Sequence, residues 1–172
     1  MSDEIFKVLL VEDDAVDQMA FTRLVENENL PYDYAVASSA AEAEKLLGQR
    51  QFDVVIIDYL LSDGTAFDVL DKINNSATIF ATSAGNEELA VKAMKAGAYD
   101  YLIKDPARNY LKVLPEIIKK SIKTRRAEKD LQDYYSRIES LIAERTAELA
   151  SEKELLSTTL ASMSDAVVAV DE

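Results

Sequence analysis

The feature of this sequence that most constrains its fold is a fivefold alternation between short apolar runs and segments with helical periodicity. The apolar runs occupy residues 7–11, 32–37, 52–58, 78–82 and 99–103. In the segments between them, apolar side chains recur three or four positions apart, as they do from Val16 to Val25. Such alternation is typical of a parallel sheet covered by helices on both sides. We therefore predict an α/β fold built on a five-stranded parallel sheet.

Polar residues follow four of these runs at the point where each strand would end. They are Glu12, Asp13, Asp14, Asp58, Thr82 and Lys104. The ligand site of such a sheet lies at the carboxyl ends of its strands, so we expect these residues around one crevice. Clustered carboxylates repel one another unless a cation such as Mg²⁺ relieves them. An aspartate beside Mg²⁺ can attack a phosphoryl group, whose charge an ammonium and a hydroxyl would stabilise.

Two absences in the composition exclude several classes of function. The 172 residues include no Cys and no His. This rules out disulfide scaffolds, Cys-based zinc sites, thiol catalysis and a histidine kinase that phosphorylates itself within this chain. The net charge is −13, and residues 1–105 carry 20 acidic and 8 basic groups. Nucleic acid is therefore not expected as a partner of this part of the chain.

The sequence also bears on the compartment. No apolar run reaches the roughly 18 residues that a membrane span requires. The amino terminus, MSDEIFK, is acidic, whereas a signal peptide begins with a basic segment. We expect a cytoplasmic protein that does not contact a membrane.

Four segments resemble, in order and in spacing, the receiver domain of two-component response regulators. They are residues 8–14 (VLLVEDD), 53–61 (DVVIIDYLL), 82–84 (TSA) and 97–104 (GAYDYLIK). The resemblance covers residues 5–105. It implies the flavodoxin-like, doubly wound (βα)5 fold for a receiver domain over residues 1–114, with its fifth helix continuing to about residue 126.

The resemblance further implies roles for individual residues. Asp58 is the expected phosphoacceptor, Thr82 would contact the phosphoryl group, and Lys104 would pair with it. Tyr101 matches the aromatic residue whose side chain moves inward on activation. One departure is Asp105, which stands where the family usually has a proline after the lysine.

The same resemblance implies a Mg²⁺ site. Glu12 and Asp13 form the expected acidic pair, with Asp13 as the direct metal ligand and Asp14 as the competing candidate. Asp58 and the backbone carbonyl of Leu60 would complete the set of ligands.

The function implied is that of a phosphorelay receiver. Because the chain lacks His, the phosphoryl group would come from a phosphohistidine on a separate histidine kinase or phosphotransfer protein. The receiver would catalyse only its own phosphorylation and dephosphorylation, so the chain is not expected to be an enzyme. The main alternative is a dimerisation scaffold that works without phosphorylation. A phosphatase of the dehalogenase type is disfavoured by Leu60, because that family has a second Asp at this position.

The residues after Pro106 form a segment rich in helix formers that contains no Gly. Tyr135, Ile142, Leu149, Leu156 and Met163 are spaced seven apart. Leu131 and Ile138 occupy the second apolar position of this seven-residue repeat. Further along, Arg145, Glu152 and Thr159 place polar side chains at the same position. We predict a signalling coiled coil over residues 115–163 that joins two copies of the chain. The alternative is a helix folded back on the receiver. Pro115 either kinks the fifth helix or opens it.

Two resemblances in this segment suggest a piece of a longer protein. Residues 144–146 (ERT) resemble the signature of signalling helices that connect sensory and output modules. Residues 155–171 resemble the entry into a PAS sensory domain, a helix followed by a first strand, with the truncated domain beginning at residue 164. The longer protein would be a hybrid sensor kinase or a cyclic-dinucleotide enzyme.

Overall fold

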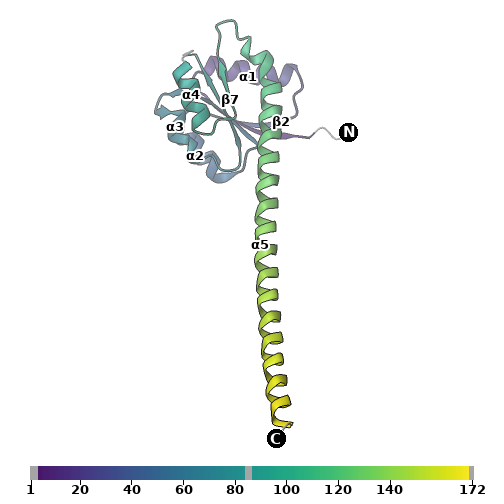
Figure 1. The fold of residues 1–172 in the computed structure, drawn as a ribbon. Helices are drawn as coiled ribbons and strands as arrows, with labels where there is room; N and C mark the ends of the chain where they lie inside the picture. Colours follow the sequence, from purple (N-terminus) through teal and green to yellow (C-terminus); the bar gives the residue numbers. More distant parts are fainter. Residues whose placement is uncertain (1–3, 84–86, 171–172) are drawn as a thin grey trace. The chain divides into compact units, whose positions relative to one another are not determined.

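The predicted five-stranded parallel sheet is confirmed (Figure 1). The computed structural model describes residues 4–83 and 87–170, except for the side chains of residues 162–170. The strand order is β2-β1-β3-β6-β7, and each neighbouring pair is parallel. The strands are β1 (Phe6–Val11), β2 (Tyr32–Ala37), β3 (Val54–Asp58), β6 (Ala77–Thr82) and β7 (Asp100–Ile103). The order changes direction at β1, which is the mark of a doubly wound sheet.

Five helices cover the two faces of the sheet. They are α1 (Ala15–Asn27), α2 (Ala40–Gln49), α3 (Ala66–Leu70), α4 (Glu87–Lys95) and α5 (Tyr110–Val170). Successive strand residues point to opposite faces, so the core divides into two clusters. One cluster packs α2, α3 and α4 against the face that contains Leu9 and Phe80. The other packs α1 and the first turns of α5 against the face that contains Val8 and Ile79.

Two helices end at other points than their local residues favour. Glycine favours the end of a helix, yet α2 continues through Gly48 to Gln49. The chain turns at Arg50, whose guanidinium stacks on Phe52 at 4.6 Å and pairs with Asp33 at 3.3 Å, so tertiary contacts set this end. Apolar residues at helical spacing continue to Ile73, but α3 stops at Leu70 and is followed by tighter turns.

Helix α4 ends just before Gly97, a residue type that favours helix ends. Gly97 has a φ of 98°, a conformation that side chains with a Cβ rarely adopt. Its N–H donates to the carbonyl of Met94, and the N–H of Ala98 donates to the carbonyl of Ala93. These two bonds satisfy carbonyls that the end of a helix leaves open. Asn86 precedes α4 and is of a type that commonly caps helices, but it lies outside the described residues.

A small hairpin follows β3 that the sequence pattern does not predict. It pairs β4 (Leu60–Leu61) with β5 (Gly64–Thr65) in antiparallel fashion. At its tip, the Asp63 carboxylate accepts the N–H groups of Ala40 and Ala41 at 2.8 and 3.0 Å. The hairpin that begins beside Asp58 is therefore attached to the first turn of α2.

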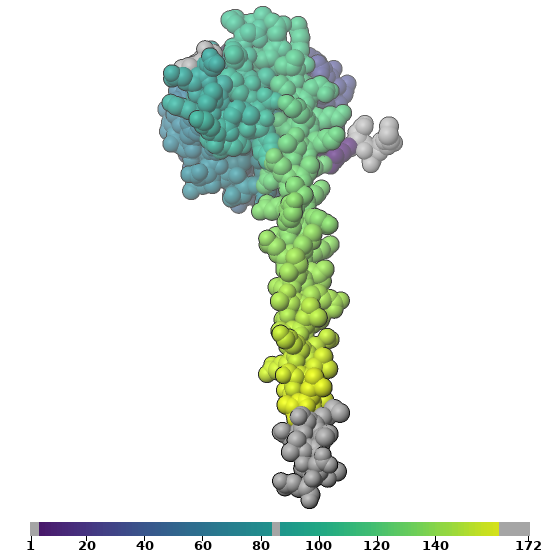
Figure 2. All heavy atoms as spheres, viewed as in Figure 1, coloured from purple at the N-terminus to yellow at the C-terminus, as the bar shows by residue number. Residues whose placement is uncertain are grey.

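The long helix α5 belongs to two units, which divide the chain into Met1–Ala127 and Glu128–Glu172. Within the first unit, Leu114, Ile118 and Ile122 are buried against the sheet. Pro115 lies inside the helix and not at its first position. In the second unit, every described side chain from 128 to 161 is exposed except Ile138, which is half-buried. Figure 2 shows one face of this segment, coloured green to yellow, as a surface of exposed side chains.

The strand expected at the start of a PAS domain is wrong for the residues described, because α5 continues as a helix to Val170. A lone strand would leave its backbone N–H and C=O groups unpaired, whereas a helix pairs them within itself. The PAS resemblance itself stays a prediction. Among the described residues, no helix combines the length and apolar character that a membrane crossing needs.

Candidate functional site

The ammonium of Lys104 contacts acidic residues at the ends of two other strands of the sheet. Lys104 directly follows β7, and its Nζ donates to Glu12 Oε2 and to Asp58 Oδ2, the latter at 2.5 Å. A third carboxylate, Asp17 Oδ2, lies 3.3 Å from the same nitrogen. Lys104 and Glu12 are buried, and the side chain of Asp58 is only 12% exposed. Residues separated by 46 and 92 positions in the chain thus meet because their strands end at one edge of the sheet.

Burial and charge pairing shift the pKa values of Glu12 and Lys104 in opposite directions. Burial raises the pKa of Glu12 to about 7, although its hydrogen bond to Lys104 and the charge of Lys104 oppose the shift. Burial alone would lower the pKa of Lys104, but hydrogen bonds to Asp58 and Glu12 outweigh it and raise that pKa above its usual value. Lys104 is therefore a fixed positive charge near neutral pH, while Glu12 can take up or release a proton there.

The two candidate aspartates after Glu12 have different surroundings. Asp14 is the N-cap of α1, and its carboxylate accepts the N–H of Val16 at 2.7 Å. The backbone N–H of Asp14 donates to Glu12 Oε1 at 3.3 Å. Asp13 is exposed. Since capping already engages the carboxylate of Asp14, the surroundings favour Asp13 over Asp14 as a ligand for a cation.

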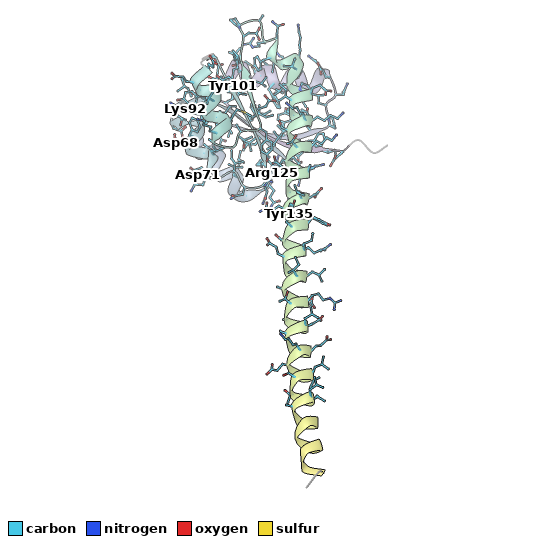
Figure 3. All side chains as sticks on the ribbon, in the orientation of Figure 1. Asp68, Asp71, Lys92, Tyr101, Arg125 and Tyr135 are labelled. Atoms are coloured by element: carbon cyan, nitrogen blue, oxygen red, sulfur yellow. The ribbon has the colours of Figure 1, made fainter. Side chains whose placement is uncertain are left out.

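The other predicted site residues lie near the same edge. Thr82 is the last residue of β6 and is buried, and its carbonyl accepts the backbone N–H of Lys104 at 2.8 Å. Tyr101, labelled in Figure 3, is a half-buried residue of β7 that packs against one of the two core clusters. Leu60 is exposed, and its N–H donates to Asp58 Oδ1 at 3.3 Å. Asp105 accepts the N–H of Tyr110 at 3.1 Å, at the first residue of α5.

The donor types at this edge fit Mg²⁺. Mg²⁺ prefers oxygen ligands and commonly takes one or two carboxylates together with water. The groups here that could serve as such ligands are the carboxylates of Asp13 and Asp58 and the backbone carbonyl of Leu60. Each oxygen of Asp58 accepts one hydrogen bond and keeps a further lone pair. Among the described residues, no three or more acidic side chains are arranged as a metal cage, but a site of this kind does not need one.

Four residues that complete the polar network were not among the predicted site residues: Asp17, Gln18, Ser38 and Arg108. Asp17 contacts Lys104, and its other oxygen accepts from Arg108 Nε at 3.3 Å. Gln18 donates from Nε2 to the backbone carbonyl of Glu12 at 2.6 Å and to Ser38 Oγ at 3.2 Å. The signal for Asp17 was its place in the first turn of the helix that follows the first strand, which brings it to the same edge of the sheet.

Comparisons with known proteins agree with this geometry. A family model described as "Response regulator receiver domain" matches residues 8–114. The chain is 34% identical over 111 residues to the alginate biosynthesis transcriptional regulatory protein AlgB of Pseudomonas aeruginosa, a match that covers 62% of this chain and 24% of that protein. It is 30% identical over 125 residues to the methanogenesis regulatory protein FilR1 of Methanothrix harundinacea, covering 68% and 27% respectively. The chain thus spans about a quarter of the length of these curated relatives.

Solved structures give the same result for the fold. The signal receiver domain of a putative Luxo repressor protein from Vibrio parahaemolyticus matches with a TM-score of 0.62 and 29% identity, over 74% of this chain and 98% of that one. A CheY-like response regulator receiver domain protein from Methanospirillum hungatei matches with a TM-score of 0.63 and 24% identity, over 73% and 99%. The second match, at its lower identity, bears on the fold alone.

Proposed function

This chain belongs to the response regulator receiver domain family, and from that premise we propose that Asp58 accepts a phosphoryl group from a phosphohistidine of a partner protein. Receiver domains are signalling domains and generally not enzymes. The observation that carries the proposal is the contact of the buried Lys104 ammonium with Asp58 and Glu12 at the carboxyl edge of the sheet. The donor would be a histidine kinase or a phosphotransfer protein, because the chain itself has no His.

In the proposed reaction, one carboxylate oxygen of Asp58 forms a bond to phosphorus as the bond between phosphorus and the imidazole nitrogen breaks. The electron pair of the broken bond stays with the imidazole. Lys104 would place its positive charge beside the transferred group, and the Thr82 hydroxyl would donate to one of its oxygens. Asp13, Asp58 and the Leu60 carbonyl would hold Mg²⁺, with Glu12 beside them. When bound, Mg²⁺ would neutralise the charge on the phosphoryl oxygens.

We propose further that the second unit joins two copies of the chain. Its exposed apolar side chains are each more than half exposed, and Tyr135 is labelled in Figure 3. The set is Leu131, Tyr134, Tyr135, Leu141, Ile142, Leu149, Leu155, Leu156 and Leu160. A helix with such a stripe buries it against another helix, and a second copy supplies a matching stripe.

The proposed dimer is a parallel coiled coil over the part of the predicted segment 115–163 that lies in the second unit, because Ile118 and Ile122 are buried against the sheet. Parallel pairing is the arrangement that the resemblance to signalling helices implies. Phosphorylation would draw Thr82 toward Asp58 and let Tyr101 turn inward. That change would reach the second unit through α5, which begins six residues after Lys104. The proposal places the protein in the cytoplasm, in keeping with its membership of the receiver domain family.

Phosphorylation with a small donor tests the proposal. With Mg²⁺ and acetyl phosphate, intact-protein mass spectrometry should find one added phosphoryl group, and Asp58→Asn should abolish it. Asp71→Asn is the matched control, because Asp71 is an exposed aspartate at the end of α3, labelled in Figure 3, and should leave labelling unchanged. Equal labelling of the Asp58→Asn protein would overturn the assignment. A wild-type protein that dimerises but takes up no phosphoryl group would instead support the scaffold function.

A further inference from the structure

We propose that Asp17 positions the ammonium of Lys104 for its contact with the phosphoryl group on Asp58. The inference rests on the proposed function, because it concerns the same reaction, and it adds a residue from a helix to those from the strand ends. Asp17 acts through Lys104 and does not touch the phosphoryl group. It is therefore a positioning residue and not a catalytic one.

Three elements supply the carboxylates that hold Lys104. Glu12 follows β1, Asp58 ends β3, and Asp17 lies in the first turn of α1. An ammonium has three N–H donors, and each of the three carboxylates can take one of them. With Glu12 and Asp58 alone, the ammonium could turn about the line that joins the two accepting oxygens. The contact with Asp17, at 3.3 Å, removes that freedom.

Asp17 is itself held from its other side. Its Oδ1 accepts from Nε of Arg108 at 3.3 Å, while its Oδ2 faces Lys104. The two oxygens of one carboxylate are thus shared between a guanidinium and an ammonium, which specifies the orientation of the side chain. Only 21% of the Asp17 side chain is exposed, so water competes little for these contacts.

The surroundings of Lys104 combine apolar walls with carboxylates. A small pocket of about 10 Å³ lies beside Lys104, and its walls include Phe21, Ile56 and Tyr110. Glu12 and Asp17 also line it, and both contact Lys104 Nζ. On this side, the polar groups that hold the ammonium are therefore two carboxylates.

Asp17 matters most when Asp58 is modified. Once Asp58 carries a phosphoryl group, its carboxyl oxygens no longer bear the full negative charge that attracts Lys104. Asp17 keeps its charge and its place, and so holds the ammonium beside the transferred group. A catalytic group whose supporting contact is removed typically loses about tenfold or more of its effect.

The test compares Asp17→Asn with Glu26→Gln, a change at an exposed acid on the same helix. At saturating acetyl phosphate and Mg²⁺, Asp17→Asn should lower the maximum rate of Asp58 phosphorylation by about tenfold, the size expected for a supporting contact. The half-saturating concentrations of donor and Mg²⁺ should change by less than about twofold, because Asp17 contacts neither. Glu26→Gln should match the wild type.

A double-mutant cycle separates positioning from a structural effect. In a Lys104→Ala background, Asp17→Asn should change the remaining rate by less than about twofold, because the residue through which it acts is gone. An unchanged rate for Asp17→Asn alone, or the same tenfold loss in both backgrounds, would overturn the inference.

A measurement without metal or donor tests the contact directly. The ¹⁵N resonance of Lys104 Nζ, detected through its ε protons and assigned with Lys104→Ala, should shift in Asp17→Asn and stay in place in Glu26→Gln. An unmoved resonance in Asp17→Asn would also overturn the inference. This measurement does not depend on phosphorylation, so failure of the proposed function and failure of the Asp17 contact remain distinguishable.

Discussion

Replacing Glu12 with Gln should change the pH dependence of stability. Burial raises the pKa of Glu12 to about 7 in the folded protein, from an ordinary value of 4.5. Between these two values the folded state therefore binds more protons than the unfolded state. Stability must then fall as pH rises through this window. Glu12→Gln removes the titrating group and keeps the size and hydrogen-bonding ability of the side chain.

The size of the effect follows from the shift. One pKa unit corresponds to about 1.4 kcal/mol, so the shift of Glu12 amounts to at most about 3.5 kcal/mol, most of it lost between pH 5 and pH 8. We expect the free energy of unfolding of the wild type to fall by roughly 2 kcal/mol over this range, relative to Glu12→Gln. Lys104, whose raised pKa keeps it protonated throughout, adds no slope. Hydrogen bonds lower the pKa values of Asp63 and Asp105, so the stability that these two carboxylates add to the folded state is lost only at more acidic pH.

Urea unfolding without Mg²⁺, followed by circular dichroism at pH 5, 6, 7 and 8, measures this difference. The control is Glu26→Gln, because Glu26 is an exposed acid and its loss should leave the wild-type profile unchanged. If the wild type and Glu12→Gln show parallel profiles, burial does not shift the protonation of Glu12, and the electrostatic account of the cluster is wrong.

Two further predictions concern the metal and the dimer. Asp13→Asn should weaken Mg²⁺ binding by about tenfold or more, because a charged oxygen ligand is lost, whereas Asp14→Asn should leave binding nearly unchanged. Calorimetric titration measures both affinities, and equal losses in both variants would contradict the choice of Asp13. Truncation after Ala127, the end of the first unit, should convert a dimer into a monomer in light scattering, since it removes the exposed apolar stripe. A truncated protein that stays as firmly dimeric as the full chain, or a full chain with the mass of a trimer, would refute the proposed coiled coil.

The sequence by itself determined the framework of the site. The spacing of apolar runs and helical segments predicted the parallel sheet, and the carboxyl ends of parallel strands share one edge. This spacing therefore places Glu12, Asp58 and Lys104 together, and the three side chains are in contact. These features could be predicted because backbone periodicity and strand direction are local properties that depend on short stretches of sequence.

Only the tertiary structure decided the contacts that depend on side-chain placement across elements. Asp17 reaches Lys104 across 87 positions, and its place in the first turn of α1 indicates the edge of the sheet at which it lies but not this contact. The Asp63 cap on α2 and the end of α2 beyond Gly48 depend in the same way on neighbours far along the chain. Helix α5 continues to Val170, so its backbone N–H and C=O groups pair within the helix. Local sequence specified the five strands and the helices between them, and packing between these elements specified where they end and which side chains meet.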